Sequence, residues 1–320
     1  MRGDQSKKVL PIGKLPLEHL RSLLRHVPRQ GPRLLIGPQI GENAAVIDAG
    51  DHYLVVATDP VTFATDHIGR YAVHVNANDI AVLGARPLWF FVVMLLVESR
   101  TTPELAETIM VDVRATCEEL GITLGGGQTE ITQGLDRPIL IGQMLGEVTP
   151  THLVRKTRTA VGDLILLTLD MAIEGTAILA REKSEQLRAR VDSALLARAA
   201  CFLSEPGISV VSAALAAANV GEEVHAMHDP TEGGLATGLF GEPVTEKQLR
   251  AHYEDLKFVR VLRPHILNIA GHRNGAMNQL LTVQELAYLL QVPKEWIFEH
   301  TNLRSKEGVA VKAQFASTKS

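Results

Sequence analysis

The sequence contains little of what marks secreted, membrane-spanning or nucleic-acid-binding proteins. Among its 320 residues are only two cysteines, Cys117 and Cys201, which form neither a disulfide framework nor a metal-ligand spacing. Its net charge of −4 argues against binding to nucleic acid over the whole chain. The longest apolar run, residues 88–97, is about half of what a bilayer span requires, and the N-terminus has no apolar signal region. We therefore expect a cytoplasmic protein without a membrane segment.

Apolar residues are plentiful, at 46% of the chain, and suffice for a core in two domains. Strand-like and helix-like segments are mixed throughout, so the predicted fold class is α/β or α+β. Cys117 falls on the apolar face of a predicted helix and is expected to be a core residue rather than a nucleophile. The pattern predicts helices at 15–26, 67–83, 103–120 and 172–183, an alanine-rich helical region at 190–219, and strands at 52–60, 88–97, 138–148 and 163–170, with another strand running into 125–130.

Capping residues set the expected helix ends. Asp66 is a suitable N-cap for the helix at 67–83, and Gly84 is suited to end it. Thr102 with Pro103 predicts the start of the next helix, which ends at Gly121.

The chain divides into three parts by composition. Residues 1–150 form the first domain, and a break near 150–163 begins a second unit that extends to residue 240. Residues 241–320 are less apolar and carry a net charge of +3, against −7 for the rest of the chain. The segment 280–302 in this tail contains a capping box and two short apolar helices, so it could be a helix-turn-helix that binds DNA. We favour an amphipathic helical pair that packs on the protein, because the second helix is nearly neutral.

The stretch HVNANDIAVLGARP, residues 74–87, places polar side chains inside an otherwise apolar helix. A buried carboxylate such as Asp79 is expensive without a partner, which could be a metal ion, another cation or a set of hydrogen-bond donors. Three further stretches combine acids or glycines with the end of a predicted strand: GENAAVID (41–48), TDP (58–60) and GGGQTE (125–130). Such oxygen donors suit Mg²⁺, and such glycines allow backbone N–H groups to approach phosphates. The alternatives are a simple cap or turn role for Asp59 and a flexible turn for the glycines.

Together these motifs resemble the ATP-binding superfamily of aminoimidazole ribonucleotide (AIR) synthetase, and most of all its branch of E-type hydrogenase maturation proteins. The resemblance covers roughly residues 10–240, and it also rests on the segments AIEGTAILARE and HDPTEGGLA. It implies an AIR-synthase-like, ATP-binding N-terminal domain that forms a homodimer, with ATP in a cleft at the dimer interface. It further implies a truncated AIR-synthase-like C-terminal domain, because the family pattern stops after residue 239.

The resemblance also assigns functional residues by position. Mg²⁺ would be held by Asp59, Asp79, Gln128 and Asp229. ATP would be bound by Asn43, Gly125, Gly126, Gly127, Thr129, His228 and Thr231. Asn43 and Gln128 stand where the family usually has charged or metal-binding residues, and an uncharged amide oxygen holds Mg²⁺ less well.

Two functions of different classes follow. The leading hypothesis is an ATP- and Mg²⁺-dependent enzyme that activates a small acceptor by phosphoryl transfer. The alternative is a nucleotide-binding or scaffold protein without turnover. A third hypothesis is a regulator that binds DNA through the tail. Hydrogenase maturation proteins end in a cysteine that carries the transferred group, and this chain has none after Cys201, so that thiol chemistry is not expected.

Overall fold

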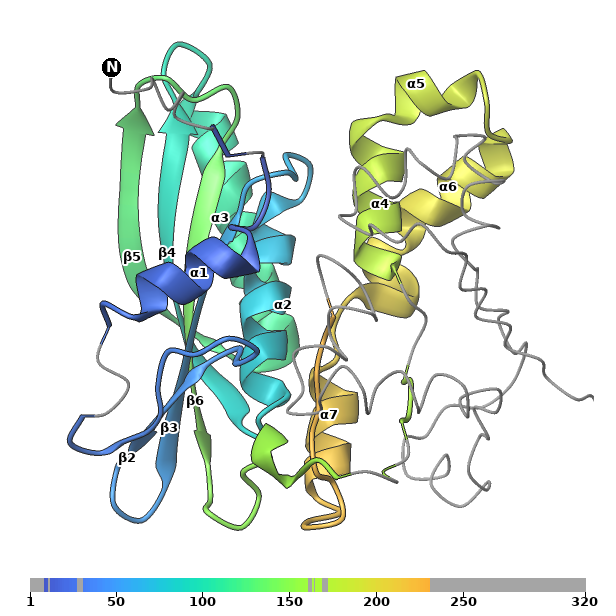
Figure 1. The fold of residues 1–320 in the computed structure, drawn as a ribbon. Helices are drawn as coiled ribbons and strands as arrows, with labels where there is room; N and C mark the ends of the chain where they lie inside the picture. The colour runs from blue at the N-terminus through green and yellow to red at the C-terminus, as the bar shows by residue number, and fades with distance from the viewer. Residues whose placement is uncertain are drawn as a thin grey trace, which may run out of the picture.

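The computed structural model describes residues 9–10, 12–27, 31–160, 163, 165–168 and 172–230. Its first unit is one six-stranded sheet with the order β1-β2-β3-β6-β4-β5, in which only β4 and β5 run parallel (Figure 1). The strands are β1 (Leu34–Ile36), β2 (Ala45–Asp48), β3 (Tyr53–Val61), β4 (Arg86–Val97), β5 (Thr123–Thr132) and β6 (Ile139–Val148). The helices of this unit are α1 (Leu17–Leu24), α2 (Ile68–Ala81) and α3 (Pro103–Leu120). The mixed α/β class predicted above is confirmed.

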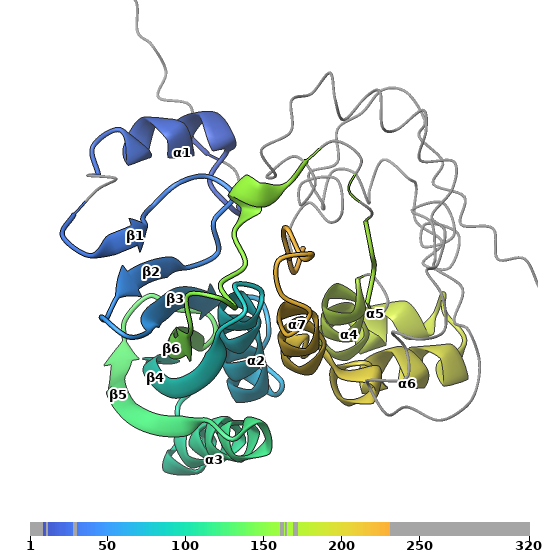
Figure 2. The same ribbon diagram turned by 90° about the horizontal axis from the view of Figure 1, so that it is seen from below.

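Helix α2 lies at the centre of the part of the chain that the structure describes. Figure 2 shows it between the sheet and helix α7 (Val211–Ala218), with α3 beside it, and its contacts with β3, β6, α3 and α7 agree. Twelve of its 14 residues are buried, which explains why apolar residues occur on most sides of this segment. Gly69 permits the close approach of α3, because a Cβ there would lie 2.8 Å from the backbone nitrogen of Val113.

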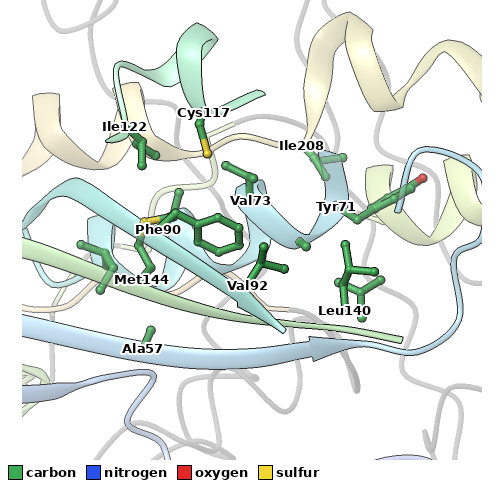
Figure 3. Close-up of a cluster of buried hydrophobic side chains, with 14 of the residues drawn as sticks. Ala57, Tyr71, Val73, Phe90, Val92, Cys117, Ile122, Leu140, Met144 and Ile208 are labelled. Atoms are coloured by element: carbon green, nitrogen blue, oxygen red, sulfur yellow. The ribbon is translucent and has the colours of Figure 1, made fainter. Parts of the chain in front are cut away.

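The core joins both units of the chain. Figure 3 shows Phe90 and Met144 of the sheet, Cys117 of α3 and Ile208 of the second unit in one cluster around α2. Full burial of each large apolar side chain contributes about 1.5–3 kcal/mol. Cys117 is 1% exposed, so its predicted core position is confirmed, and burial raises the pKa of its thiol to about 11.

The second unit is helical in its described part. It contains the 3-10 helix η1 (Lys156–Arg158), α4 (Ile173–Glu182), α5 (Ser184–Arg188), α6 (Ser193–Cys201), a π-helical turn (Leu203–Gly207) and α7. The carboxylate of Glu182 ties α4 to the first unit, because it accepts hydrogen bonds from the backbone N–H groups of Thr65 and Asp66 and from the Thr65 hydroxyl. In the described part no single helix is long and apolar enough to cross a membrane, and one bent pair, Ser193–Cys201 with Leu203–Ala218, meets the criterion jointly.

Two local predictions were wrong. Asp66 does not cap α2: His67 occupies the N-cap position at φ 54°, while Asp66 accepts a hydrogen bond from Arg181. Residues 163 and 165–168 form no strand, although a strand was predicted over 163–170. A strand requires a hydrogen-bonded neighbour, and no described strand pairs with this segment. The ends of α3 are as predicted, with the Thr102 side chain accepting from Leu105 N and Gly121 at φ 68°.

Candidate functional site

The site is centred on Asp79, near the C-terminal end of α2. Its side chain lies beside the loop that precedes β2, where Asn43 Nδ2 donates a 2.8 Å hydrogen bond to Asp79 Oδ1. The same nitrogen donates a 2.7 Å bond to Oδ1 of Asp229, which comes from the far end of the described chain. Three segments separated by 36 and 186 residues therefore converge on one amide group.

The electrostatics of this group, called here the acidic cluster (Asp59, Asp79 and Asp229), are unfavourable without a cation. Burial and the charges of Asp229 and Asp59 raise the pKa of Asp79 well above its usual range. Burial, followed by the charge of Asp59, raises the pKa of Asp229 in the same way, against the opposing effects of hydrogen bonding and Lys156. Mg²⁺ prefers oxygen ligands and usually binds one or two carboxylates together with phosphate oxygens. The carboxylates present here therefore fit that ion when a phosphate supplies the remaining ligands. In the described residues, no three His, Cys, Asp or Glu side chains are close enough to form a metal site by themselves.

The two asparagines before Asp79 have structural roles. Asn76 accepts a bond from the backbone N–H of Asp59 and donates to the carbonyl of Asp59, so it fixes the acidic end of β3 against α2. Asn78 donates to Ile208 O and accepts from Val210 N, and thereby connects α2 to the start of α7. Three of the polar residues in this apolar helix are thus explained: each amide satisfies backbone groups of a neighbouring segment, and Asp79 belongs to the acidic cluster.

One residue of the site was missed by sequence reasoning. Lys156 of η1 is 8% exposed, and its ammonium donates to the carbonyl of Gly41 and, at 3.3 Å, to Oδ1 of Asn43. A lysine in a basic stretch gives no signal of burial, so only the fold could identify it.

His228 is the second polar side chain of interest. Its Nδ1 is buried, has no hydrogen-bond partner among the described residues, and lies 4.0 Å from Oδ1 of Asp229. Burial, with the charges of Lys156 and Lys14, lowers the pKa of His228 to about 4. The neighbouring His225 instead pairs with Asp163 at 2.8 Å. The predicted nucleotide contact of Thr231 lies outside the described residues, as does the tail 241–320.

The glycine strand (Gly125–Thr129, within β5) is not near the acidic cluster in the same chain. β5 is the edge strand, and β3 with Asp59 lies three strands away, or about 14 Å at the usual strand spacing. All five residues are exposed, and they form part of a strand rather than the flexible turn considered as an alternative. Gly127 is needed there for packing, because its φ is +153° and a Cβ would collide with the Val92 carbonyl.

Comparison with known proteins identifies relatives of both units. Residues 41–148 match the family described as AIR synthase related protein, N-terminal domain, and residues 160–240 match the corresponding C-terminal domain. A hydrogenase expression/formation protein of Methanocaldococcus jannaschii is 28% identical over 209 residues, which is 64% of this chain and 58% of the relative. The selenide, water dikinase of Aeromonas hydrophila is 28% identical over 219 residues, covering 65% of this chain and 57% of the enzyme. The match thus spans less than two thirds of each of these curated relatives.

A solved structure agrees with the sequence relatives. The hydrogenase maturation protein HypE in complex with ATP superposes with a TM-score of 0.50 at 25% identity, over 77% of this chain and 74% of the other. The two matched domains contain all three residues of the acidic cluster: Asp59 and Asp79 lie in the first, and Asp229 lies in the second.

Proposed function

The chain belongs to the AIR synthase related family, and from this membership we propose that it binds ATP with Mg²⁺ and transfers a phosphoryl group to a small acceptor. The main support is that the carboxylates of Asp79 and Asp229, which are far apart in sequence, meet at one amide group, while the charge of Asp59 acts to raise the pKa of both. Mg²⁺ held there would neutralise the charge of the phosphates and of the transferred group.

The chain's own residues would then have distinct tasks. Asp79 and Asp229 provide the oxygens for the cation, while Asn76 holds the Asp59 backbone so that this carboxylate stays beside them. His228, neutral because its pKa is lowered to about 4, has a buried nitrogen available to accept or donate a hydrogen bond. Positioning and charge are the main contributions expected of a protein in phosphoryl transfer.

We further propose that the active form is a homodimer in which the glycine strand of one copy faces the acidic cluster of the other. This is supported by the exposure of Gly125–Thr129 on an edge strand and by their separation from Asp59 within one chain. In such a dimer the strand's N–H groups and Thr129 would reach phosphate oxygens from the side opposite the carboxylates.

The test is calorimetric titration of the purified chain with a non-hydrolysable ATP analogue, with and without Mg²⁺. Binding that requires Mg²⁺ and weakens at least about 100-fold in Asp79→Asn is expected, because one carboxylate ligand is lost. Asp51→Asn, the same change at a side chain that is 91% exposed, is the matched control and should bind like the wild type. Equal affinity in wild type and Asp79→Asn would contradict the proposal.

The second candidate, nucleotide binding without turnover, is favoured by one observation: the amide nitrogen of Asn43, rather than an oxygen, faces Asp79 and Asp229. Mg²⁺-dependent analogue binding without any release of phosphate from ATP would select it.

A further inference from the structure

The side-chain amide of Asn43 has a fixed orientation because both of its ends have charged partners. Both N–H donors of Nδ2 are used, one by Asp79 and one by Asp229. Its oxygen, Oδ1, faces the Lys156 ammonium at 3.3 Å. Turning the amide by 180° would place its oxygen against two carboxylates and its NH₂ group against a cation. The charges around the amide therefore determine which atom faces the carboxylates.

The position of Nδ2 is that of an ion that bridges two carboxylates. The two Oδ1 atoms lie under 3 Å from one nitrogen, so they are within about 6 Å of each other. A divalent cation that is bonded to these two Oδ1 atoms would occupy the place of Nδ2. An ion that bridges the carboxylates through these oxygens therefore competes with the Asn43 amide.

Lys156 supplies the positive charge of this arrangement. It is buried, and its ammonium is held by the Gly41 carbonyl two residues before Asn43, so it fixes the backbone of the loop as well as the amide. The bonds from Lys156 through Asn43 to the two carboxylates form a continuous chain, here called the amide clamp (Lys156, Asn43, Asp79 and Asp229).

We propose that the amide clamp takes the place of a bridging divalent cation, so that the free protein holds Asp79 and Asp229 together without metal and accepts Mg²⁺ only in company with a nucleotide. The nucleotide step rests on the proposed function. The claim that Asn43 holds Asp79 and Asp229 together in the free protein rests only on the hydrogen bonds of the amide clamp. A ligand with phosphates would bring its own oxygens to the ion, so the clamp would have to open only when those oxygens compensate for the lost hydrogen bonds.

The experiment measures thermal unfolding of the full chain after treatment with EDTA, and again with MgCl₂ or MnCl₂, in the absence of nucleotide. The wild type should melt at the same temperature in all three solutions. Asn43→Asp replaces the donor with a third carboxylate at the same place. It should melt lower than the wild type in EDTA and recover by about 5 °C with a saturating divalent ion. Asn43→Ala, which frees the two carboxylates without adding charge, should also gain stability from the ion.

Two further variants make the result specific. Asn219→Asp introduces the same change at an exposed position and should show no response to divalent ions. Lys156→Met removes the charge that orients the amide, so its melting temperature should rise with Mg²⁺. Lys156→Arg keeps the charge, so its melting temperature should not change with Mg²⁺, as in the wild type.

Several outcomes would overturn the proposal. A wild type that gains as much from Mg²⁺ alone as Asn43→Asp would show that the ion already binds there. Asn43 variants that do not respond would show that the carboxylates do not take an ion in place of the amide. A Lys156→Met variant whose melting temperature does not change with Mg²⁺ would show that Lys156 does not orient the amide. Because no nucleotide is present, these results are independent of the ATP-analogue titration, so the two proposals can fail separately.

Discussion

The acidic cluster and the glycine strand carry the same type of sequence signal but are built in opposite ways. Two members of the acidic cluster, Asp79 and Asp229, are held in the amide clamp, whose residues are joined by hydrogen bonds across as many as 186 residues. The glycine strand is a continuous piece of sequence on the exposed edge of the sheet. The cluster therefore depends on contacts between distant segments, whereas the glycine strand is an exposed edge of the described sheet and is the surface that we propose for dimer formation. Three substitutions test how the glycine strand and the polar residues of α2 are built, and they follow from the largest expected effect to the smallest.

The largest effect is expected from Gly127→Ala in the glycine strand. Its φ of +153° is unfavourable for alanine, and the added Cβ would collide with the Val92 carbonyl. Strain and overpacking together should lower the free energy of unfolding by about 4 kcal/mol. Chemical denaturation of variant and wild type would measure this difference.

The adjacent Gly126→Ala is the matched control for that experiment. Its φ is +135°, but a Cβ there meets nothing within 4 Å, so only the backbone cost applies. Equal losses in the two variants would mean that β5 does not pack against β4 as closely as described.

An intermediate effect is expected from Ile131→Arg on β5. Ile131 is 56% exposed, and if β5 forms the dimer interface, a buried arginine should raise the dissociation constant at least about 100-fold, equivalent to about 3 kcal/mol. Sedimentation at a series of concentrations would measure it. Val111→Arg, on α3 and 47% exposed, is the control that should leave the association unchanged. A wild type that is monomeric at all concentrations would refute the dimer.

The smallest effect is expected from His74, another polar residue of α2, and concerns the pH dependence of stability. The imidazole of His74 is 1% exposed and, unlike the side chains of Asn76, Asn78 and Asp79, has no hydrogen-bond partner in the part of the chain that the structure describes. Burial, followed by the charge of Arg70, lowers the pKa of His74 to about 4, against the opposing charges of Glu119 and Asp112. Its folded pKa thus lies below the unfolded value of 6.5, so the unfolded state binds the proton first as the pH falls. Stability should be lost below pH 6.5, by about 2 kcal/mol at pH 5.

His74→Leu should remove that loss, and the difference between the unfolding free energies of variant and wild type at pH 7 and pH 5 measures it. The difference also isolates His74 from His228, whose pKa is lowered in the same direction. His26→Leu, at an exposed histidine, should leave the pH dependence as it is. A wild-type protein whose pH dependence matches that of His74→Leu would show that His74 is solvated or paired in solution.

Local signals accounted for much of the first unit. Thr102, Pro103 and Gly121 set the ends of α3 because capping depends on the nearest backbone groups. Cys117 could be placed in the core because helical periodicity defines one buried face. The strand at 163–170 could not be judged in this way, since a strand exists only with a partner, and apolar composition does not name one.

For the candidate site, the sequence indicated which carboxylates are costly to bury but not what offsets the cost. Asp79 was expected to need a partner from its apolar surroundings alone. That the partner is the amide nitrogen of Asn43, and that Lys156 orients it, depends on contacts between distant segments that no spacing rule describes.

The fold class, the family and the candidate acids could be predicted from the sequence alone, because periodicity, capping and motif order are local properties. The convergence of Asp229 and Lys156 near the end of α2, and the separation of the glycine strand from Asp59 by three strands, became known only from the folded structure. The physical reason is that side-chain hydrogen bonds and buried charges act over a few ångströms of space, whatever the distance along the chain.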